Sequence, residues 1–512
     1  MAQQTTGKIM GTILLEDGST VPGVLVEAAS SKLVGKATAV SDENGTYKLL
    51  NLAPGVYTLT FTLQGLQTVV QKNVNLVAEQ TVTLNVPMKM GEVTEQITVS
   101  AIAAQIDVKS TAKTQTLTKE QIQTLPKGRN FDSLLTTIPG VQNEPLVAGA
   151  SFDGASGLEN VYYVDGVDTT SILNGQAGQE VNFDFVEEVQ VKASGYAAEF
   201  GGSLGGVINV ITRSGGNEFH GEILGYYQGA PLRSSYSDRL DLDHTDPTQQ
   251  TSRYYKYTEL IGDDNDHRFE GGFNLGGYIV KDKLWFFGSF MPIYYTNTRT
   301  VNHRTGATEE YITKDWDFSE TYWNYNLKLT GQLATNLRAS ASFVSNTLVR
   351  KGPELINHPT AKSSANPTDG YDEYGWTYPN YSANFSMDWN VGNLQVNLRG
   401  GYFMTDKIDP QVAPSEPYWR FAQEQPAGYA ATSNAQLDIP AEWVRSTGWR
   451  SAPAYPTLMQ KSKNEKMSVN ADFSYYLSLM GDHALKAGVQ FVRQGQNYDN
   501  GAVYPVVWLG WD

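Results

Sequence analysis

The glycine-rich run around Ser203 fits G-x-S-x-G, the pattern of a hydrolase nucleophile elbow. Such an elbow places its serine on a tight turn between a strand and a helix, where the hydroxyl is exposed and the helix N-terminus helps to stabilise an oxyanion. The residues that follow, 207–212, are rich in β-branched side chains and predict a strand, and Gly215 and Gly216 then predict a turn or linker. Because no helix is expected after Ser203, we do not expect this serine to be a catalytic nucleophile.

A long polar segment contains a cluster of carboxylates whose oxygens could bind Ca²⁺. The cluster consists of Asp238, Asp241, Asp243 and Asp246, followed by Asp263, Asp264 and Asp266. The spacing of an EF-hand loop is absent, so a solvated acidic loop is the alternative interpretation. The six histidines are scattered and lack the H-E-x-x-H spacing of a zinc site. Apart from this calcium hypothesis, we expect neither a metal nor a cofactor.

The composition restricts the classes of function. A chain of 512 residues, with 40% apolar and 18% charged residues, is long enough for two or three domains. The absence of cysteine excludes disulfides, thiolate catalysis and Cys-ligated zinc. A net charge of -16 argues against a nucleic-acid partner, because such proteins carry clustered Lys and Arg. No run of 18 apolar residues predicts a transmembrane helix, and the first ten residues do not have the pattern of a signal peptide.

Residues 1–92 predict a small domain of short β-strands. Strands are expected at 7–15, 21–26, 46–49 and 56–61, and turn sequences such as 42–45 separate them. Turn signals at roughly every tenth residue are typical of a β-sandwich.

Residues 93–216 predict a domain of mixed α and β structure. Thr118 begins a capping box, which predicts a short helix that ends at Pro126. A second short helix is expected at 131–137. A strand at 161–164 is expected to enter a tight turn at Asp165 and Gly166.

Residues 217–512 show a hydrophobic period of two. In the stretch 269–279 the odd positions are apolar or glycine, while Glu270 and Asn274 lie on the other face. Nine strands are expected, at 219–227, 269–279, 284–295, 325–333, 337–343, 383–391, 394–402, 467–475 and 485–491. Short turns join them at one end, and long polar segments join them at the other, at 228–266, 346–380 and 404–465.

This pattern is typical of an outer-membrane β-barrel, in which one side-chain face contacts lipid and the other a polar lumen. The 29 Tyr, 19 Phe, 10 Trp and 48 Gly support this interpretation, because such barrels are enriched in aromatic residues and glycine. A set of tyrosines near strand ends would suit the interfacial girdle of a barrel: Tyr294, Tyr295, Tyr475 and Tyr476. A soluble β-sandwich or solenoid, which also alternates, is the alternative fold.

The number of strands also bears on how much of a barrel is present. A barrel of the 22-stranded transporter class needs far more chain than residues 217–512 supply. An open sheet of about nine strands would leave unpaired backbone groups in lipid, at a high cost in free energy. We therefore expect the sequence to be a fragment that contains the first part of a large antiparallel transmembrane barrel.

Two stretches of the chain resemble known families. Residues 11–12, 21–24, 42–47 and 51–59 resemble the carboxypeptidase regulatory-like domain, which implies an immunoglobulin-like sandwich without catalytic residues of its own. The middle domain resembles the plug domain of TonB-dependent outer-membrane receptors, at 117–122, 125–126, 128–131, 138–141, 163–167 and 200–215. The order of the two domains resembles the Oar-like branch of these receptors. The complete expectation is a mainly β protein: a sandwich at 1–92, an α+β plug at 93–216 and barrel strands at 217–512.

The resemblance to a plug implies a role for the opening glycines. They would let the plug backbone turn sharply and pass close to the barrel wall without a clash of Cβ atoms. The residues interpreted in this way are Asp165, Gly166, Gly201, Gly202, Gly205, Gly206 and Gly215. Ser203 then becomes a small packing residue, 207–212 one of the last plug strands, and 213–217 the link to the first barrel strand.

The resemblance also implies a function, which is transport of a bulky solute across the outer membrane with energy from the TonB–ExbB–ExbD complex. No enzymatic activity is expected. A short extended segment before the plug would add as a strand to TonB. The segment that fits consists of Glu95, Gln96, Ile97, Thr98, Val99, Ser100 and Ala101. The alternative interpretations of this segment are the last strand of the sandwich and a plain linker.

The expected location is the bacterial outer membrane, with the N-terminal domain in the periplasm and the long loops outside the cell. The expected partners are the TonB complex, the lipid and lipopolysaccharide around the barrel, and an unidentified extracellular ligand. The alternative function is a surface protein for adhesion or envelope architecture without active transport.

Overall fold

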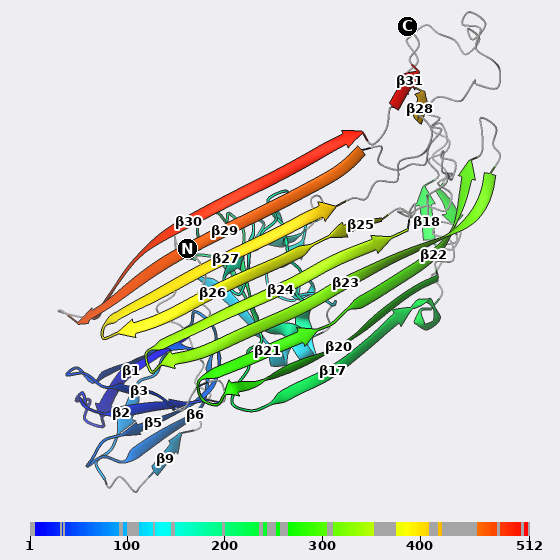
Figure 1. Cartoon of the computed structure of the whole chain (residues 1–512). Coiled ribbons are helices and arrows are strands. Elements are labelled where there is room, and N and C mark those ends of the chain that lie inside the picture. Colours follow the sequence, from blue (N-terminus) through cyan, green and yellow to red (C-terminus); the bar gives the residue numbers. More distant parts are fainter. Residues whose placement is uncertain are drawn as a thin grey trace, which may run out of the picture.

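The computed structural model describes residues 6–30, 33, 36–91, 96–99, 112–125, 128–144, 149–196, 200–234, 239–242, 252–255, 265–304, 311–352, 375–408, 418–421, 458–478, 482–502 and 506–509. These residues form an N-terminal domain, a middle domain and a large antiparallel sheet (Figure 1). In the described part of the chain, no helix has both the length and the apolar character that crossing a membrane requires.

The N-terminal domain is a sandwich of two sheets. One sheet has the order β4 (Thr46–Leu52), β1 (Gly7–Leu15) and β7 (Thr81–Thr83), with β8 (Val86–Met88) also paired to β1. The other has the order β3 (Lys36–Val40), β2 (Leu25–Ala29), β5 (Gly55–Thr62), β6 (Thr68–Leu76) and β9 (Gln96–Val99). The alternating apolar residues of both sheets meet in one core, which includes the fully buried Ile9, Tyr47 and Phe61. The predicted β-sandwich is confirmed.

The middle domain contains a five-stranded sheet. Its strand order is β10 (Lys113–Thr118), β15 (Val186–Ser194), β16 (Val207–Thr212), β13 (Val161–Val164) and β14 (Val167–Asp168). Strands β13 and β16 run parallel, and the other pairs are antiparallel. All six residues of β16 are buried, as its central place requires. A separate pair is formed by β11 (Val141–Asn143) and β12 (Ala150–Phe152).

Two short helices lie beside this sheet. Helix α1 (Lys119–Thr124) begins at the predicted capping box, in which the backbone N–H of Thr118 donates to the side chain of Gln121 at 3.0 Å. Helix α2 (Asp132–Leu135) is shorter than the predicted 131–137, because only one turn is needed to bury Leu134 and Leu135 in the core. A single 3₁₀ turn, η1 (Phe183–Phe185), leads into β15.

The large sheet begins at β17 (His220–Gly229) and ends at β30 (Asp482–Ala502). Between them lie β20 (Asn265–Val280), β21 (Leu284–Phe290), β22 (Ile293–Arg304), β23 (Tyr311–Ala334), β24 (Leu337–Lys351), β25 (Gly375–Tyr378), β26 (Asn380–Val391), β27 (Leu394–Ile408) and β29 (Leu458–Ser478). Because β21 and β22 both lie between β20 and β23, and β25 and β26 between β24 and β27, each pair is one interrupted strand. The described residues thus form nine antiparallel lines, and the predicted number of strands is confirmed.

Several short elements lie outside the large sheet. A 3₁₀ turn, η3 (Ala230–Leu232), follows β17. Two small strand pairs are β18 (Arg239–Leu242) with β19 (Ser252–Tyr255), and β28 (Tyr418–Phe421) with β31 (Val506–Leu509).

The large sheet exposes apolar side chains and buries polar ones, the reverse of a water-soluble protein. In β20 the side chains of Glu270 and Asn274 are 2% exposed, whereas Phe269 and Phe273 are 53% and 50% exposed. The same alternation places other apolar side chains on the outer face: Leu275, Leu327, Leu329, Phe343, Phe385, Val469 and Phe473. A continuous apolar outer face with polar residues inside is the pattern of a strand wall in lipid.

The strands are longer than the alternation of apolar residues predicts. Strand β23 has 24 residues, whereas the sequence pattern predicts strand only at 325–333. Strands β24, β27 and β29 likewise extend into the long polar segments that were expected between strands, and β22 extends beyond the predicted strand at 284–295. The additional strand residues do not alternate strictly between apolar and polar. They are strand because backbone hydrogen bonds between neighbouring strands continue beyond the part that has an apolar face.

The tyrosine pairs at strand ends do not all belong to an outer girdle. Tyr294 and Tyr475 are 41% and 47% exposed, but Tyr476 is 8% exposed and faces the inside of the sheet. Consecutive strand residues point to opposite faces, so only one tyrosine of each adjacent pair can lie on the lipid side. The expectation was therefore wrong for Tyr476 and for Tyr295, which shares a face of β22 with the buried Asn297 and Arg299.

Candidate functional site

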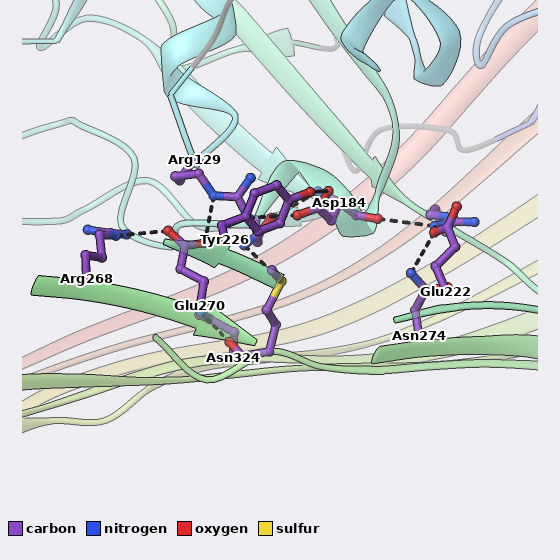
Figure 2. Close-up of polar contacts among 11 residues, drawn as sticks. Arg129, Asp184, Glu222, Tyr226, Arg268, Glu270, Asn274 and Asn324 are labelled. Carbon is purple, nitrogen blue, oxygen red and sulfur yellow. Dashed lines mark hydrogen bonds and ion pairs between the residues drawn. The ribbon is translucent and has the colours of Figure 1, made fainter. Parts of the chain in front are cut away.

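The middle domain is held against the inner face of the large sheet by a cluster around Arg129 (Figure 2). Arg129 Nε donates to Glu270 Oε2 of β20 at 2.7 Å, and Arg129 Nη2 donates to Asp184 Oδ2 at 2.9 Å. The guanidinium also lies 3.7 Å from the ring centroid of Tyr226, whose hydroxyl donates to Asp184 at 3.1 Å. Arg268 donates to the second oxygen of Glu270 at 2.9 Å. One arginine thus joins carboxylates of two separate parts of the chain.

The charges of this cluster depend on one another. Burial raises the pKa of Asp184, although Arg129 opposes this change. Burial alone would lower the pKa of Arg129, but the hydrogen bond and charge of Glu270, together with Asp184, raise it. While the middle domain is seated on the sheet, each of these charges faces a partner of opposite sign, and burial without that partner would be costly.

A second ion pair follows where the chain leaves the middle domain. Arg213 Nη1 donates to Glu222 Oε2 of β17 at 2.6 Å, and the Asn274 side chain donates to the same oxygen at 2.8 Å. The backbone N–H of Arg213 donates to Phe185 O at 2.8 Å. Figure 2 shows Glu222 and Asn274 beside the Arg129 cluster. These contacts fix the orientation of the chain as it enters β17.

A third contact surrounds the predicted turn residue Asp165. Asp165 and Gly166 both have a positive φ, of 47° and 86°, as a tight turn between β13 and β14 requires. The Lys328 ammonium of β23 donates to Asp165 Oδ1 at 2.8 Å, and the hydroxyls of Thr212 and Ser342 donate to Oδ2 at 2.5 and 2.9 Å. Burial works to raise the pKa of Asp165, but Lys328 and these hydrogen bonds outweigh it and lower the pKa. The carboxylate therefore stays ionised in a buried place.

Neutral and charged side chains extend this contact along the sheet. The Gln179 amide donates to Val344 O at 3.0 Å, and Ser382 donates to Gln179 Oε1 at 2.6 Å. Lys466 of β29 pairs with Asp168 of β14 at 3.0 Å. The contact between the domains is thus polar over several strands.

At Gly215 the backbone passes close to the backbone of strands β20 and β21, the kind of contact that was expected of these glycines. A Cβ atom at this position would overlap the carbonyl oxygen of Phe286 and lie 2.6 Å from that of Gly277. Gly205 and Gly206 have no room for a side chain because of neighbours within the middle domain. A Cβ atom would lie 2.6 Å from the Asn160 side chain at Gly205 and 2.6 Å from the Phe152 side chain at Gly206. Gly201 and Gly202 lie in the turn before β16, and Gly202 has a φ of 91°.

Ser203 does not have the setting of a nucleophile. Its hydroxyl lies 3.1 Å from the carbonyl oxygens of Glu159 and Gly206. The chain continues directly into strand β16, with no helix between the serine and Val207. This geometry supports the interpretation of Ser203 as a packing residue.

The N-terminal domain contacts strand β15 of the middle domain through the loop that contains Ala78 and Glu79. Glu188 of β15 accepts a hydrogen bond from the backbone N–H of Ala78 at 2.9 Å, and Gln190 donates to Ala78 O at 2.8 Å. Lys192 forms an ion pair with Glu79. Three alternate residues of one strand therefore bind two consecutive residues of the N-terminal domain. Burial raises the pKa of Glu188 to about 8, although the Ala78 hydrogen bond opposes this change.

The N-terminal domain also contacts the large sheet, at the end with the short turns (Figure 1). The Lys8 ammonium donates to the Tyr476 hydroxyl at 2.7 Å, and that hydroxyl donates to Gln395 at 3.1 Å. Gln395 in turn binds Asn51, whose side chain donates to Asn390 at 2.8 Å. Tyr476 is therefore buried by the N-terminal domain and not by lipid.

The predicted TonB-binding segment forms strand β9 over Gln96–Val99, and its other residues lie outside the described part. Strand β9 is the edge strand of a sandwich sheet, which was the alternative interpretation of this segment.

The predicted calcium loop is largely outside the described residues, which include only the backbone of Asp241 in β18. Asp266, from the same cluster, forms an ion pair with Arg233 at 2.5 Å. The described residues contain no group of three or more His, Asp or Glu side chains placed to bind a metal. The calcium hypothesis stays a prediction.

Sequence reasoning missed the charged partners of the contacts. Three of these partners are Glu222, Glu270 and Lys328. Each lies at an inward position of a strand whose side chains alternate between apolar and polar, and a charge at such a position is the signal that could have identified them as contacts of the middle domain. The residues of β15 that bind the N-terminal domain gave no such signal, because Glu188 and Gln190 bind backbone atoms of Ala78 and Lys192 pairs with Glu79, all in a loop that is distant in the sequence.

Comparison with known proteins agrees with this architecture. Residues 8–89 match the carboxypeptidase regulatory-like domain, and residues 107–207 match the TonB-dependent receptor plug domain. The chain is 34% identical over 316 residues to the TonB-dependent transporter Oar of Myxococcus xanthus, covering 59% of this chain and 28% of that protein. It is 28% identical over 201 residues to the ferric enterobactin receptor of Pseudomonas aeruginosa, covering 34% and 26%. The chain thus spans about a quarter of the length of these curated relatives.

A solved structure shares the fold. The outer membrane transporter YddB from Escherichia coli aligns with a TM-score of 0.53 at 13% identity, over 75% of this chain and 48% of that one. The chain thus contains a carboxypeptidase regulatory-like domain and a plug domain, is similar to the TonB-dependent transporter Oar over these parts, and shares the fold of an outer membrane transporter.

Proposed function

We propose that the protein carries a bulky solute across the bacterial outer membrane with energy from the TonB–ExbB–ExbD complex. The observation that carries this proposal is a plug domain seated on the polar inner face of a sheet whose outer face is apolar. A plug in this place closes the path along the inner face, so passage of a solute requires the plug to move. The relatives named as a transporter and as a ferric enterobactin receptor support this class of function.

The contacts between plug and wall suit reversible movement. Ion pairs and hydrogen bonds of Arg129, Arg213 and Asp165 hold the plug, and each can exchange its partner for water. The buried polar atoms of the wall include several that have no hydrogen-bond partner among the described residues, such as those of Asn326, Asn470 and Ser289. A polar contact of this kind is held less firmly than an apolar core, because water can replace its hydrogen bonds.

In this proposal the wall strands lie in the outer membrane, in contact with lipid and lipopolysaccharide. The N-terminal domain, which lies at the end of the short turns, faces the periplasm, and the long connections face the outside of the cell. TonB binds the segment 95–101 through main-chain hydrogen bonds and pulls on the plug.

The proposal is tested by the accessibility of Ser289, which is 4% exposed on the inner face of β21. The chain has no cysteine, so Ser289→Cys introduces a single thiol on the buried inner face of β21. In energised cells we expect a water-soluble maleimide to label this thiol slowly, as the plug moves. A protonophore, or deletion of residues 95–101 in the same variant, should abolish the labelling while the protein stays in the membrane.

Labelling that is equal with and without the proton gradient would contradict energised movement of the plug. That result would instead favour a surface protein for adhesion or envelope architecture.

A further inference from the structure

Strand β9 is paired within the N-terminal domain. It runs parallel to β6, with Thr68 opposite Gln96 and Gln71 opposite Val99. Figure 1 shows β9 beside β6 at the outer edge of the domain. Four of the seven residues of the proposed TonB-binding segment therefore already belong to a sheet of this chain.

The chain that leads to β9 is tied to the beginning of β6. The backbone N–H of Gln67 donates to Lys89 O at 2.9 Å, and that of Gly91 donates to Gly65 O at 3.3 Å. Leu66 and Met90 form an isolated bridge between these two bonds. Four residues, 92–95, separate these bonds from β9. Residues 89–91 and strand β9 therefore pair with consecutive parts of the chain, 65–67 and 68–71.

The edge to which β9 pairs is held in place independently of β9. Strand β6 is paired on its other side with β5, from Gly55 opposite Leu76 to Phe61 opposite Val69. The domain itself is bound to the plug through Ala78 and Glu79, and to the wall through Lys8 and Asn51. Strand β9 can therefore leave without disruption of the sandwich. A four-residue edge strand is also the kind of element that opens at the lowest free energy.

We propose that the N-terminal domain sequesters the TonB-binding segment along β6, and that TonB captures the segment by displacing it from this edge. This inference rests on the proposed function of residues 95–101. A strand that binds its partner through main-chain hydrogen bonds must present its N–H and C=O groups, and β9 has those of one edge engaged with β6. The apparent affinity for TonB is then reduced by the fraction of time that the segment spends on β6.

A disulfide between the two strands tests the proposal in the full-length chain. Thr68→Cys with Gln96→Cys places thiols at aligned positions of neighbouring strands, which lie about 4.8 Å apart, within the range that a disulfide spans. We expect the oxidised variant to bind the periplasmic domain of TonB about tenfold or more weakly, and reduction to restore binding. The matched control is Glu27→Cys with Thr38→Cys, an aligned pair of β2 and β3 at the opposite edge of the same sheet. Oxidation of this control should leave binding unchanged.

The outcomes separate this inference from the proposed function. Unchanged binding by the oxidised Thr68→Cys, Gln96→Cys variant would overturn the inference, since TonB would then add to the free edge of β9. If neither the reduced variant nor the original chain binds TonB, the proposed role of 95–101 fails first.

Hydrogen exchange in the unmodified chain gives a second measurement that needs no substitution. Displacement of β9 exposes the backbone N–H groups of β6 that face it. We expect saturating TonB domain to speed the exchange of amides within Thr68–Gln71, while amides of β2 keep their rate. Slower or unchanged exchange at Thr68–Gln71 would contradict displacement.

Discussion

At the scale of single residues, the protein places opposite charges on parts of the chain that meet across the plug and the wall. Arg129, Arg213 and Asp165 belong to the plug or its exit, and their partners Glu270, Glu222 and Lys328 belong to the wall. Ionised groups with paired hydrogen bonds tolerate burial only while the partner is present. Each pair therefore reports whether the plug is seated.

Asp165→Asn should loosen the plug more than any surface charge substitution. It leaves the Lys328 ammonium buried without its carboxylate, a change that costs about 3–5 kcal/mol. We expect faster cleavage of the plug by protease in detergent solution. Asp153→Asn is the matched control, because Asp153 pairs with Lys113 at the surface, where such a pair contributes about 0–1 kcal/mol. Equal protease sensitivity of the two variants would contradict a buried ionic contact.

The lowered pKa of Asp165 also has a consequence for pH. The seated state holds the carboxylate ionised, so its contribution to stability is present above the ordinary pKa near 4. That contribution is lost as the pH falls through the lowered value. Protease sensitivity of the original chain should therefore increase only in strongly acidic solution, and Asp165→Asn should remove this part of the pH dependence.

Glu188 predicts a pH dependence of opposite sign for docking of the N-terminal domain. Burial against this domain raises the pKa to about 8, and Glu187 and Glu79 add to the effect whereas Lys328 opposes it. The docked state thus binds a proton more tightly than the undocked one. Docking should be strongest below the ordinary pKa of about 4.5 and weaken as the pH rises to about 8.

The distance between spin labels on the N-terminal domain and on a wall turn checks this prediction. Cysteines that replace the exposed Asp17 and Thr335 provide the two attachment points. The population of long distances should rise between pH 5 and pH 9 in the original chain, and Glu188→Gln should flatten the profile. An unaltered profile in Glu188→Gln would assign the pH dependence to another group.

At the scale of elements, the link from the plug into the wall determines how the two parts assemble. Strand β16 ends at Thr212, Arg213 pairs with β17, and Gly215 then passes against the backbone of β20 and β21. The missing Cβ permits this approach. The link is thus built from one ion pair and one glycine.

Gly215→Ala should reduce the yield of assembled protein severalfold. Its Cβ would overlap backbone oxygen of Phe286, and backbone in a sheet cannot move aside as a flexible side chain can. Gly225→Ala is the matched control in β17, since a Cβ there meets no atom within 4 Å. Heat-modifiable migration in gel electrophoresis measures the assembled fraction, and equal fractions for both variants would contradict the steric argument.

At the scale of the whole molecule, the large sheet has an apolar outer face and a polar inner face. Exposed Leu327 and Leu329 alternate with buried Asn326, Lys328 and Thr330 along β23. In water such an outer face would cause association, whereas in a bilayer it is the face that lipid solvates.

Leu329→Arg should destabilise the protein by about 2–4 kcal/mol in lipid, as a charge near the middle of a strand wall does. Leu329 is 47% exposed on the outer face, five residues from the end of β23 at the short turn. Ile408→Arg is the matched control, because Ile408 is 41% exposed at the far end of β27, where the cost falls to about 0–1 kcal/mol. Unfolding from bilayers by urea compares the two, and equal losses of stability would contradict a lipid-facing role.

The period-two alternation from β17 to β30, the turn at Asp165 and Gly166, and the capping box at Thr118 were all predictable, because each depends on neighbours within a few residues. The lengths of the outer strands were not, because backbone pairing continues where the apolar pattern ends.

By itself, the sequence determined which faces are apolar, where the chain turns and in which order the domains follow, since these depend on local composition and period. Only the tertiary structure decided which charges meet across the plug and the wall, that Tyr476 lies under the N-terminal domain, and that Gln96–Val99 pairs with β6. The physical reason is that an ion pair or a strand edge finds its partner through space. Lys328 and Asp165 are 163 residues apart in the chain, and no local pattern specifies such a contact.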